Sequence, residues 1–325
     1  MSISATDIPG RLDDQHRRVY EEMPERQLDI NDVTVSVAAL RDRSQTREAA
    51  PLPDGVVSED CMVPGPDGSP DVFVRLYRPS SLLSNIPAFY WIHGGGMVTG
   101  SVHMSDGFCG QQSLDLGIVV ASVEYRLAPE HPYPAPLEDC YAGLRWLARS
   151  SEELGIDPKH IAVGGGSAGG GLAAGLALLA RDRGEIDICF QLLVYPMIDD
   201  RNITNSSLTI TDKRLWNRTA NIVGWNAYLA GQAGSERVSH YAAPARATDL
   251  AGLPPTYINV GALDLFLDED IAYAQALLAA GIPTELHVYP GAFHGSPNSV
   301  PDAPVSRRWI TDQQAALKRA LFGNV

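Results

Sequence analysis

The sequence predicts an α/β fold in which a mostly parallel central sheet is flanked by helices on both faces. Segments rich in valine, isoleucine, phenylalanine and tyrosine alternate along the chain with segments of helical pattern. Several strand-like segments are apolar almost without interruption, as expected of strands buried on both faces. With 325 residues, the chain is also long enough to bury a large core.

The strand-like and helical segments follow one another in a regular order. The predicted strands are 71–79, 86–94, 117–126, 160–165, 190–198, 255–262 and 284–290. The predicted helices are 136–154, 171–182, 268–280 and 303–321. Each of these helices follows a strand, which suits crossover connections on the faces of a parallel sheet.

Two stretches depart from this alternation, and we predict that together they form a helical cap. Residues 1–50 are polar and helix-rich, and we expect them to form the N-terminal part of the cap. Residues 200–248 interrupt the strand–helix rhythm with aromatic and small residues, as an insertion that commonly carries function. The predicted core then consists of residues 51–199 and residues 249–325.

Charge and cysteine pattern argue against several classes of function. The formal net charge is −14, which argues against nucleic-acid partners and stable membrane association, because both favour a basic face. The four cysteines contain no C-x-x-C pair, so neither a metal site nor a redox motif is predicted. The polar N-terminus lacks the apolar segment of a signal peptide, and we expect a cytoplasmic protein. A homodimer is compatible with these features.

A single serine lies inside a run of glycines between a predicted strand and a predicted helix. Because glycine destabilises packed elements, the cluster around Ser167 indicates close backbone approach or positive φ. Residues 165–169 match G-x-S-x-G, in which a sharp strand-to-helix turn exposes a nucleophilic serine. Glycine loops before helices also bind phosphates, but a dinucleotide site is disfavoured because its partner motifs are absent from the sequence.

A second glycine motif, HGGG at residues 93–96, follows a predicted buried strand upstream of the serine. Beside a G-x-S-x-G serine, such a loop supplies N–H donors that stabilise a tetrahedral oxyanion. The residue after the nucleophile, here Ala168, supplies a further donor. The alternative is an ordinary glycine loop after a strand.

An acid and a base are expected after the serine, in the order Ser, Asp or Glu, His. Asp264 follows one predicted strand and His294 follows the next, so both would reach the carboxyl edge of the sheet beside Ser167. The acidic residues 268–270 lie where the next helix begins, and they are explained sufficiently if they cap free N–H groups and complement the helix dipole. Position therefore favours Asp264 as the acid.

Five motifs occur together and in order over roughly residues 70–300. They are HGGG at 93–96, YRLAPEHPYPAPLED at 125–139, GGSAGG at 165–170, DLFLDE at 264–269 and FHG at 293–295. In this combination the chain resembles the bacterial hormone-sensitive-lipase-like esterases, family IV of the α/β-hydrolase fold. The resemblance implies that Ser167 is the nucleophile, His294 the base and Asp264 the orienting acid.

The resemblance also implies an oxyanion hole and exposes two departures from the family pattern. The implied donors are Gly94, Gly95 and Ala168, with Gly96 close by. Gly166 stands where the family often has aspartate, and Leu265 stands where it usually has proline. Neither change removes a catalytic group.

Together these features predict a cofactor-independent carboxylic ester hydrolase that acts on a small ester. The family resemblance and the predicted cap imply short- to medium-chain acyl groups. An amidase or a lactonase would use the same serine and oxyanion hole, and a ligand receptor on the same fold is a further alternative. The aromatic residues Trp216, Trp225 and Tyr228 of the predicted insertion are expected either to line an apolar acyl or alcohol site or to pack within the cap.

Overall fold

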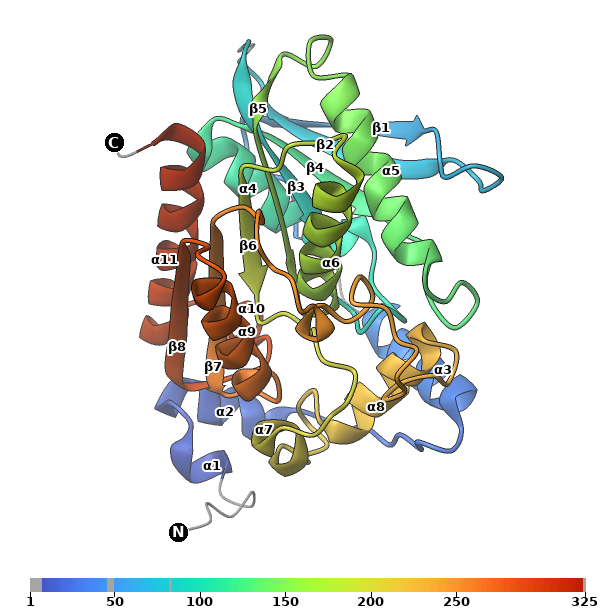
Figure 1. Ribbon diagram of the computed structural model, residues 1–325. Helices are drawn as coiled ribbons and strands as arrows, with labels where there is room; N and C mark the ends of the chain where they lie inside the picture. Colours follow the sequence, from blue (N-terminus) through green and yellow to red (C-terminus); the bar gives the residue numbers. More distant parts are fainter. Residues whose placement is uncertain (1–7, 46–49, 82–83, 324–325) are drawn as a thin grey trace.

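The computed structural model describes residues 8–45, 50–81 and 84–323. These residues form an eight-stranded, mostly parallel sheet with helices on both faces, so the predicted fold class is confirmed (Figure 1). The order of the strands in the sheet is β1-β2-β4-β3-β5-β6-β7-β8. The strands are β1 (Val56–Val63), β2 (Val72–Pro79), β3 (Ile86–Ile92), β4 (Val119–Glu124), β5 (Ile156–Gly166), β6 (Phe190–Val194), β7 (Thr256–Leu263) and β8 (Thr284–Phe293).

The sheet is antiparallel at one edge and parallel elsewhere. β2 runs antiparallel to both β1 and β4, whereas all pairs from β4 to β8 are parallel. β1 was not among the predicted strands. Its side chains are largely exposed, so it lacks the apolar run by which the buried strands were recognised.

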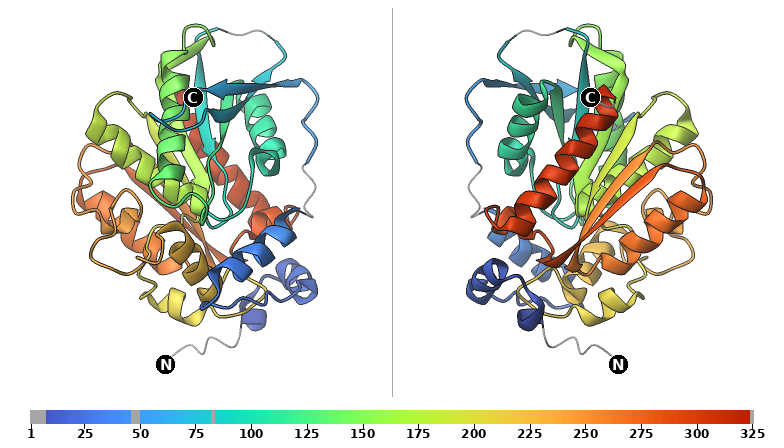
Figure 2. Two further views of the ribbon diagram at one scale, coloured as in Figure 1. Left: turned by 90° about the vertical axis from the view of Figure 1, so that its right-hand side faces the viewer. Right: turned by 90° about the vertical axis from the view of Figure 1, so that its left-hand side faces the viewer.

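Helices cover both faces of the sheet (Figure 2). One face carries α5 (Ala135–Arg149), α6 (Ala168–Arg183) and α9 (Leu267–Ala279). The other face carries α4 (Asp106–Leu116) and α11 (Pro304–Phe322), which pack with Phe89 and Trp91 of β3 in a separate apolar cluster. α6 is buried along most of its length. Its own alanine, glycine and leucine residues occupy all of its faces, so no face requires contact with water.

The remaining helices gather at one end of the molecule, beyond the carboxyl ends of the parallel strands (Figure 1). They comprise α1 (Ile8–Arg11), α2 (Asp14–Glu22), α3 (Val33–Gln45), α7 (Asn205–Thr209) and α8 (Arg218–Tyr228). Short helical turns complete the fold at η1 (Val102–Ser105), η2 (Pro244–Arg246) and α10 (Ser296–Ser299). Among the helices of the described residues, none is both long and apolar enough to cross a membrane.

Candidate active site

Ser167 occupies the turn between β5, which ends at Gly166, and α6, which begins at Ala168. Its φ of 58° and ψ of −122° lie in a region that non-glycine residues rarely adopt, and such strain is typical of functional positions. The glycines on either side allow backbone segments to meet. A Cβ atom at Gly165 would lie 2.2 Å from the carbonyl oxygen of Gly169, so only glycine permits this turn.

Three side chains from different elements meet at this turn. His294 Nε2 lies 3.0 Å from Ser167 Oγ, and His294 Nδ1 lies 2.8 Å from Asp264 Oδ2. If the carboxylate oxygen of Asp264 accepts, the Nδ1–H group donates a hydrogen bond to it, and Nε2 can then accept a hydrogen bond from the hydroxyl of Ser167. The second carboxylate oxygen of Asp264 accepts a hydrogen bond of 3.0 Å from the backbone N–H of Phe266. The structure therefore brings together the three residues that the sequence predicted.

Aromatic rings enclose the imidazole of His294. Ring centroids of Tyr195, Phe266 and Trp216 lie 4.7, 5.2 and 6.4 Å from that of His294. The sequence analysis did not predict Tyr195 or Phe266 as neighbours of His294. Tyr195 directly follows β6, and Phe266 lies two residues after Asp264, so their positions in the sequence could have indicated a place at the site. The imidazole is consequently only 12% exposed.

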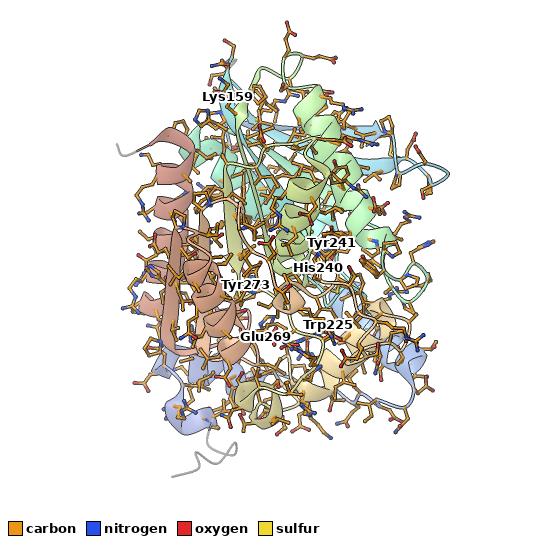
Figure 3. All side chains as sticks on the ribbon, viewed as in Figure 1. Lys159, Trp225, His240, Tyr241, Glu269 and Tyr273 are labelled. Atoms are coloured by element: carbon orange, nitrogen blue, oxygen red, sulfur yellow. The ribbon has the colours of Figure 1, made fainter. Side chains whose placement is uncertain are left out.

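The three aromatic residues singled out in the insertion separate into two groups. Trp225 and Tyr228 lie on α8 and are fully buried. Figure 3 marks the position of Trp225. Trp216 instead lies against the glycine loop, where a Cβ atom at Gly96 would be 2.3 Å from its ring. Its indole N–H donates to Asn221 Oδ1 at 3.1 Å, which fixes the plane of the ring. Of the three, Trp216 is the one beside His294.

The predicted oxyanion loop packs directly against the serine turn. A Cβ atom at Gly94 would lie 2.8 Å from the carbonyl oxygen of Gly166, so the two turns are in close contact. Gly95 and Gly96 have φ values of 124° and 62°, which favour glycine. Ala168 is the first residue of α6, so it lies where helix N–H groups lack intrahelical partners.

His93 stabilises this loop as a neutral imidazole. Its ring stacks on Tyr125 at 4.2 Å between centroids, and its Nδ1 donates to the carbonyl oxygen of Gly94 at 2.8 Å. The hydroxyl of Tyr125 donates to the carbonyl oxygen of His93 at 3.0 Å. Burial lowers the pKa of His93 to about 4, so the ring is uncharged at neutral pH.

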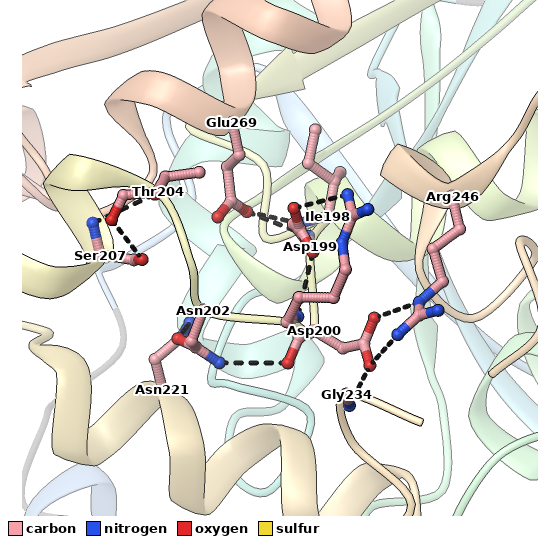
Figure 4. Close-up of polar contacts among 11 residues, drawn as sticks. Ile198, Asp199, Asp200, Asn202, Thr204, Ser207, Asn221, Gly234, Arg246 and Glu269 are labelled. Atoms are coloured by element: carbon pink, nitrogen blue, oxygen red, sulfur yellow. Dashed lines mark hydrogen bonds and ion pairs between the residues drawn. The ribbon is translucent and has the colours of Figure 1, made fainter. Parts of the chain in front are cut away.

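The structure contradicts one half of the interpretation of residues 268–270, the capping of N–H groups of their own helix. All three do lie in the first turn of α9, where carboxylates complement the helix dipole. The N-cap position of α9 is Phe266, and no side chain caps it. Asp268 Oδ2 instead accepts from the backbone N–H of Ser206 at 2.7 Å. Glu269 Oε1 accepts from the N–H groups of Ile198 and Asp199 at 3.0 and 3.1 Å (Figure 4). These carboxylates bind backbone that enters or lies within the insertion, which sequence position alone could not reveal.

The N-terminal helix α2 contacts the segment that carries His294. The imidazole of His16 is fully buried, with Nδ1 3.1 Å from the carbonyl oxygen of Gly291 and Nε2 3.1 Å from Ser306 Oγ. The ring also meets Phe293 edge-on at 5.5 Å. His16 was not recognised from the sequence, because its partners lie at the opposite end of the chain.

The arrangement supplies a serine hydroxyl beside a base, a buried carboxylate behind the base, and a glycine loop next to the hydroxyl. Such a combination can activate the hydroxyl for attack on a carbonyl carbon. Within residues 8–45, 50–81 and 84–323, no group of three or more His, Cys, Asp or Glu side chains could hold a metal ion.

Comparisons with known proteins agree with this geometry. A family model described as the α/β-hydrolase fold matches residues 89–298. The chain is 35% identical over 313 residues to the esterase LipI of Mycobacterium tuberculosis, covering 94% of each chain. It is 37% identical over 298 residues to the carboxylesterase NlhH of the same species, covering 88% of this chain and 90% of NlhH. Its structure is similar to that of a bacterial heroin esterase, with a TM-score of 0.88, 44% identity, and coverage of 96% of this chain and 98% of the other.

Proposed function

Since the chain belongs to the α/β-hydrolase family, we propose that it hydrolyses short- to medium-chain carboxylic esters through an acyl-enzyme formed on Ser167. The chain is an esterase of this superfamily, as its resemblance to the hormone-sensitive-lipase-like enzymes implied. The observation that carries the proposed mechanism is the continuous series of hydrogen bonds from Ser167 Oγ through His294 to Asp264.

In the proposed acylation step, Ser167 Oγ attacks the ester carbonyl carbon while His294 Nε2 accepts the hydroxyl proton. Asp264 keeps the other imidazole nitrogen protonated and stabilises the imidazolium that forms. The oxyanion would receive hydrogen bonds from the backbone N–H groups of Gly94, Gly95 and Ala168, with Gly96 close by. His294 then donates its proton to the departing alcohol.

In the proposed deacylation step, water replaces the alcohol and the same residues act again. His294 removes a proton from the water, which attacks the acyl carbon, and Ser167 leaves with that proton. No cofactor enters either step. The reaction is therefore carried by this chain's own side chains and backbone N–H groups.

We propose a short- to medium-chain acyl group, and the rings around the imidazole support an apolar one. Tyr195, Phe266 and Trp216 give His294 aromatic, apolar surroundings. We also propose that residues 1–50, of which 1–7 and 46–49 lie outside the described part of the chain, form a cap with residues 200–248. The core then consists of residues 51–199 and 249–325. The helices of the proposed cap lie beyond the carboxyl ends of the parallel strands (Figure 1), which supports this division. The cytoplasmic location and a homodimer stay predictions.

A substrate panel with a matched variant tests the proposed function. We expect the wild-type protein to hydrolyse p-nitrophenyl acetate and butyrate faster than the palmitate, and Ser167→Ala to lose at least a hundredfold in kcat with an unchanged melting temperature. Residual activity in Ser167→Ala above about a hundredth of wild type would contradict the assignment of the nucleophile. Faster turnover of matched anilides or lactones than of esters would favour the amidase or lactonase alternative.

A further inference from the structure

A serine of the insertion contacts the loop that carries Asp264. Ser206 lies on α7 and is almost fully buried. Its hydroxyl donates to the carbonyl oxygen of Leu265 at 2.7 Å and accepts from the N–H of Asp268 at 3.2 Å. Its own N–H donates to Asp268 Oδ2 at 2.7 Å. We call these three hydrogen bonds the Ser206 clamp.

The bond to Leu265 reaches Asp264 through one rigid group. The carbonyl of Leu265 and the N–H of Phe266 belong to the same peptide unit, which is planar. That N–H donates to Asp264 Oδ1 at 3.0 Å. A change in orientation of this peptide plane therefore moves the donor that holds the carboxylate opposite His294.

The hydrogen bonds form one continuous series across the site. It runs from Ser206 Oγ through the peptide after Leu265 to Asp264, and then through His294 to Ser167 Oγ. Hydrogen bonds in series polarise one another, so a donor at the Leu265 carbonyl makes the Phe266 N–H a stronger donor to the carboxylate. The first member of the series comes from the insertion and the last from the end of β5.

We propose that Ser206 is a positioning residue for the esterase reaction, which holds the Asp264 carboxylate in register with His294 through the Leu265–Phe266 peptide. The inference rests on the proposed function for its kinetic consequence. Only a side chain that both donates and accepts can make the two side-chain bonds of the clamp. The hydroxyl of Thr204, 3.4 Å away, adds a donor to Ser206 because the serine proton is directed at Leu265.

The chain offers a matched control in the next residue. Ser207 is fully buried on the same helix, but its hydroxyl donates to the carbonyl oxygen of Thr204, within the first turn of α7 (Figure 4). Ser207→Ala therefore removes a buried hydroxyl and a hydrogen bond without touching the segment of Asp264. A general effect of loosening α7 would appear in both Ser206→Ala and Ser207→Ala. An effect through the Ser206 clamp would appear only in Ser206→Ala.

The test compares Ser206→Ala, Ser206→Thr and Ser207→Ala in the full chain. We expect Ser206→Ala to lower kcat about five- to tenfold with an unchanged KM, as the loss of one buried hydrogen bond predicts. Ser206→Thr keeps the hydroxyl, so its kcat should stay within about twofold of the wild-type value. The kcat of Ser207→Ala should stay within the same range. Ser206→Cys, of similar size but a weak donor, provides the same comparison if the alanine variant does not fold.

A spectroscopic readout separates this inference from the proposed function. The His294 Nδ1 proton, shared with Asp264, should give a downfield proton NMR resonance that moves in Ser206→Ala and keeps its position in Ser207→Ala. That measurement needs no substrate, so it tests the clamp even if the chain hydrolyses no ester of the panel. An unmoved resonance and an unchanged kcat in Ser206→Ala would overturn the inference, as would equal effects in Ser207→Ala.

Discussion

At the scale of single residues, burial decides the protonation state of His93. Its pKa is lowered to about 4 because the ring is enclosed and a charged imidazole would lose its hydration. In the unfolded chain the imidazole of His93 becomes protonated near pH 6.5, whereas in the folded chain it becomes protonated only near pH 4. The full stability is therefore present above about pH 6.5 and is lost progressively as the pH falls towards 4.

The loss of stability at low pH should differ measurably between the wild type and His93→Asn. Between pH 7 and pH 5, His93 should lower the free energy of unfolding of the wild type by about 2 kcal/mol. The asparagine variant can still donate to the Gly94 carbonyl but does not titrate, so its decrease over the same interval should be smaller by about that amount. Urea unfolding at the two pH values measures both decreases. Equal decreases would contradict a buried neutral imidazole.

The residues of the candidate site differ in how far the sequence could predict them. Ser167, Asp264 and His294 follow strand ends and lie in short motifs, so the sequence alone predicts them. Their roles stay a prediction, although the structure brings them together. Ser206 and His16 lie in no motif. Their contacts are with residues far away in the chain, so the sequence around them does not indicate a role.

At the scale of elements, the N-terminal helices hold two segments of the site. α2 contacts the segment before His294 through His16 and through the N–H of Asp13, which donates to the Gly291 carbonyl at 3.1 Å. On α3, Arg41 donates to the carbonyl oxygens of Val98 and Ala128 at 2.8 and 3.0 Å, next to the glycine loop. These helices therefore support both the segment that carries His294 and the glycine loop.

Removal of residues 1–45 should consequently change both specificity and solubility. The truncated chain would expose the apolar surfaces that cover Tyr20 and Leu40, so we expect aggregation during gel filtration. The soluble fraction should show an altered ratio of activities across p-nitrophenyl esters of increasing acyl length. A monodisperse truncated protein with the wild-type acyl profile would indicate that the segment is only a tail.

Elements were predicted where burial leaves a clear pattern in the sequence. β3 and α6 are buried almost throughout, so their apolar runs identified them. β1 and α4 were missed, since β1 is mostly exposed and α4 mixes glycine, glutamine and serine with few apolar residues. Their structure depends on pairing with β2 and on packing against the sheet, and neither is encoded locally.

At the scale of the whole molecule, parallel pairing explains how distant residues meet. β5, β6, β7 and β8 are adjacent and parallel, so their carboxyl ends share one edge of the sheet. Ser167 and His294 are 127 residues apart in the chain, yet each follows a strand at that edge. The fold class was enough to predict this meeting, because ligands bind at the carboxyl ends of such strands.

The contacts between the insertion and the core could not be predicted in the same way. They depend on backbone groups, such as the carbonyl of Leu265 and the N–H of Ser206, whose positions no side-chain pattern reports. A short helix such as α7 also has too few residues for a periodic signal. The sequence therefore indicated which elements form the site but not how they support one another.

Covalent labelling tests most directly the central claim that Ser167 is the nucleophile of an esterase. The wild-type protein would be treated with the organophosphate paraoxon, which phosphorylates activated serines, and then analysed by intact-mass and peptide mass spectrometry. We predict one diethylphosphoryl group per chain, on the peptide that contains Ser167, with loss of ester hydrolysis in proportion to labelling. Ser167→Ala should acquire no label under the same conditions. Stoichiometric labelling of another residue, or inactivation of the wild type with Ser167 unmodified, would contradict the account.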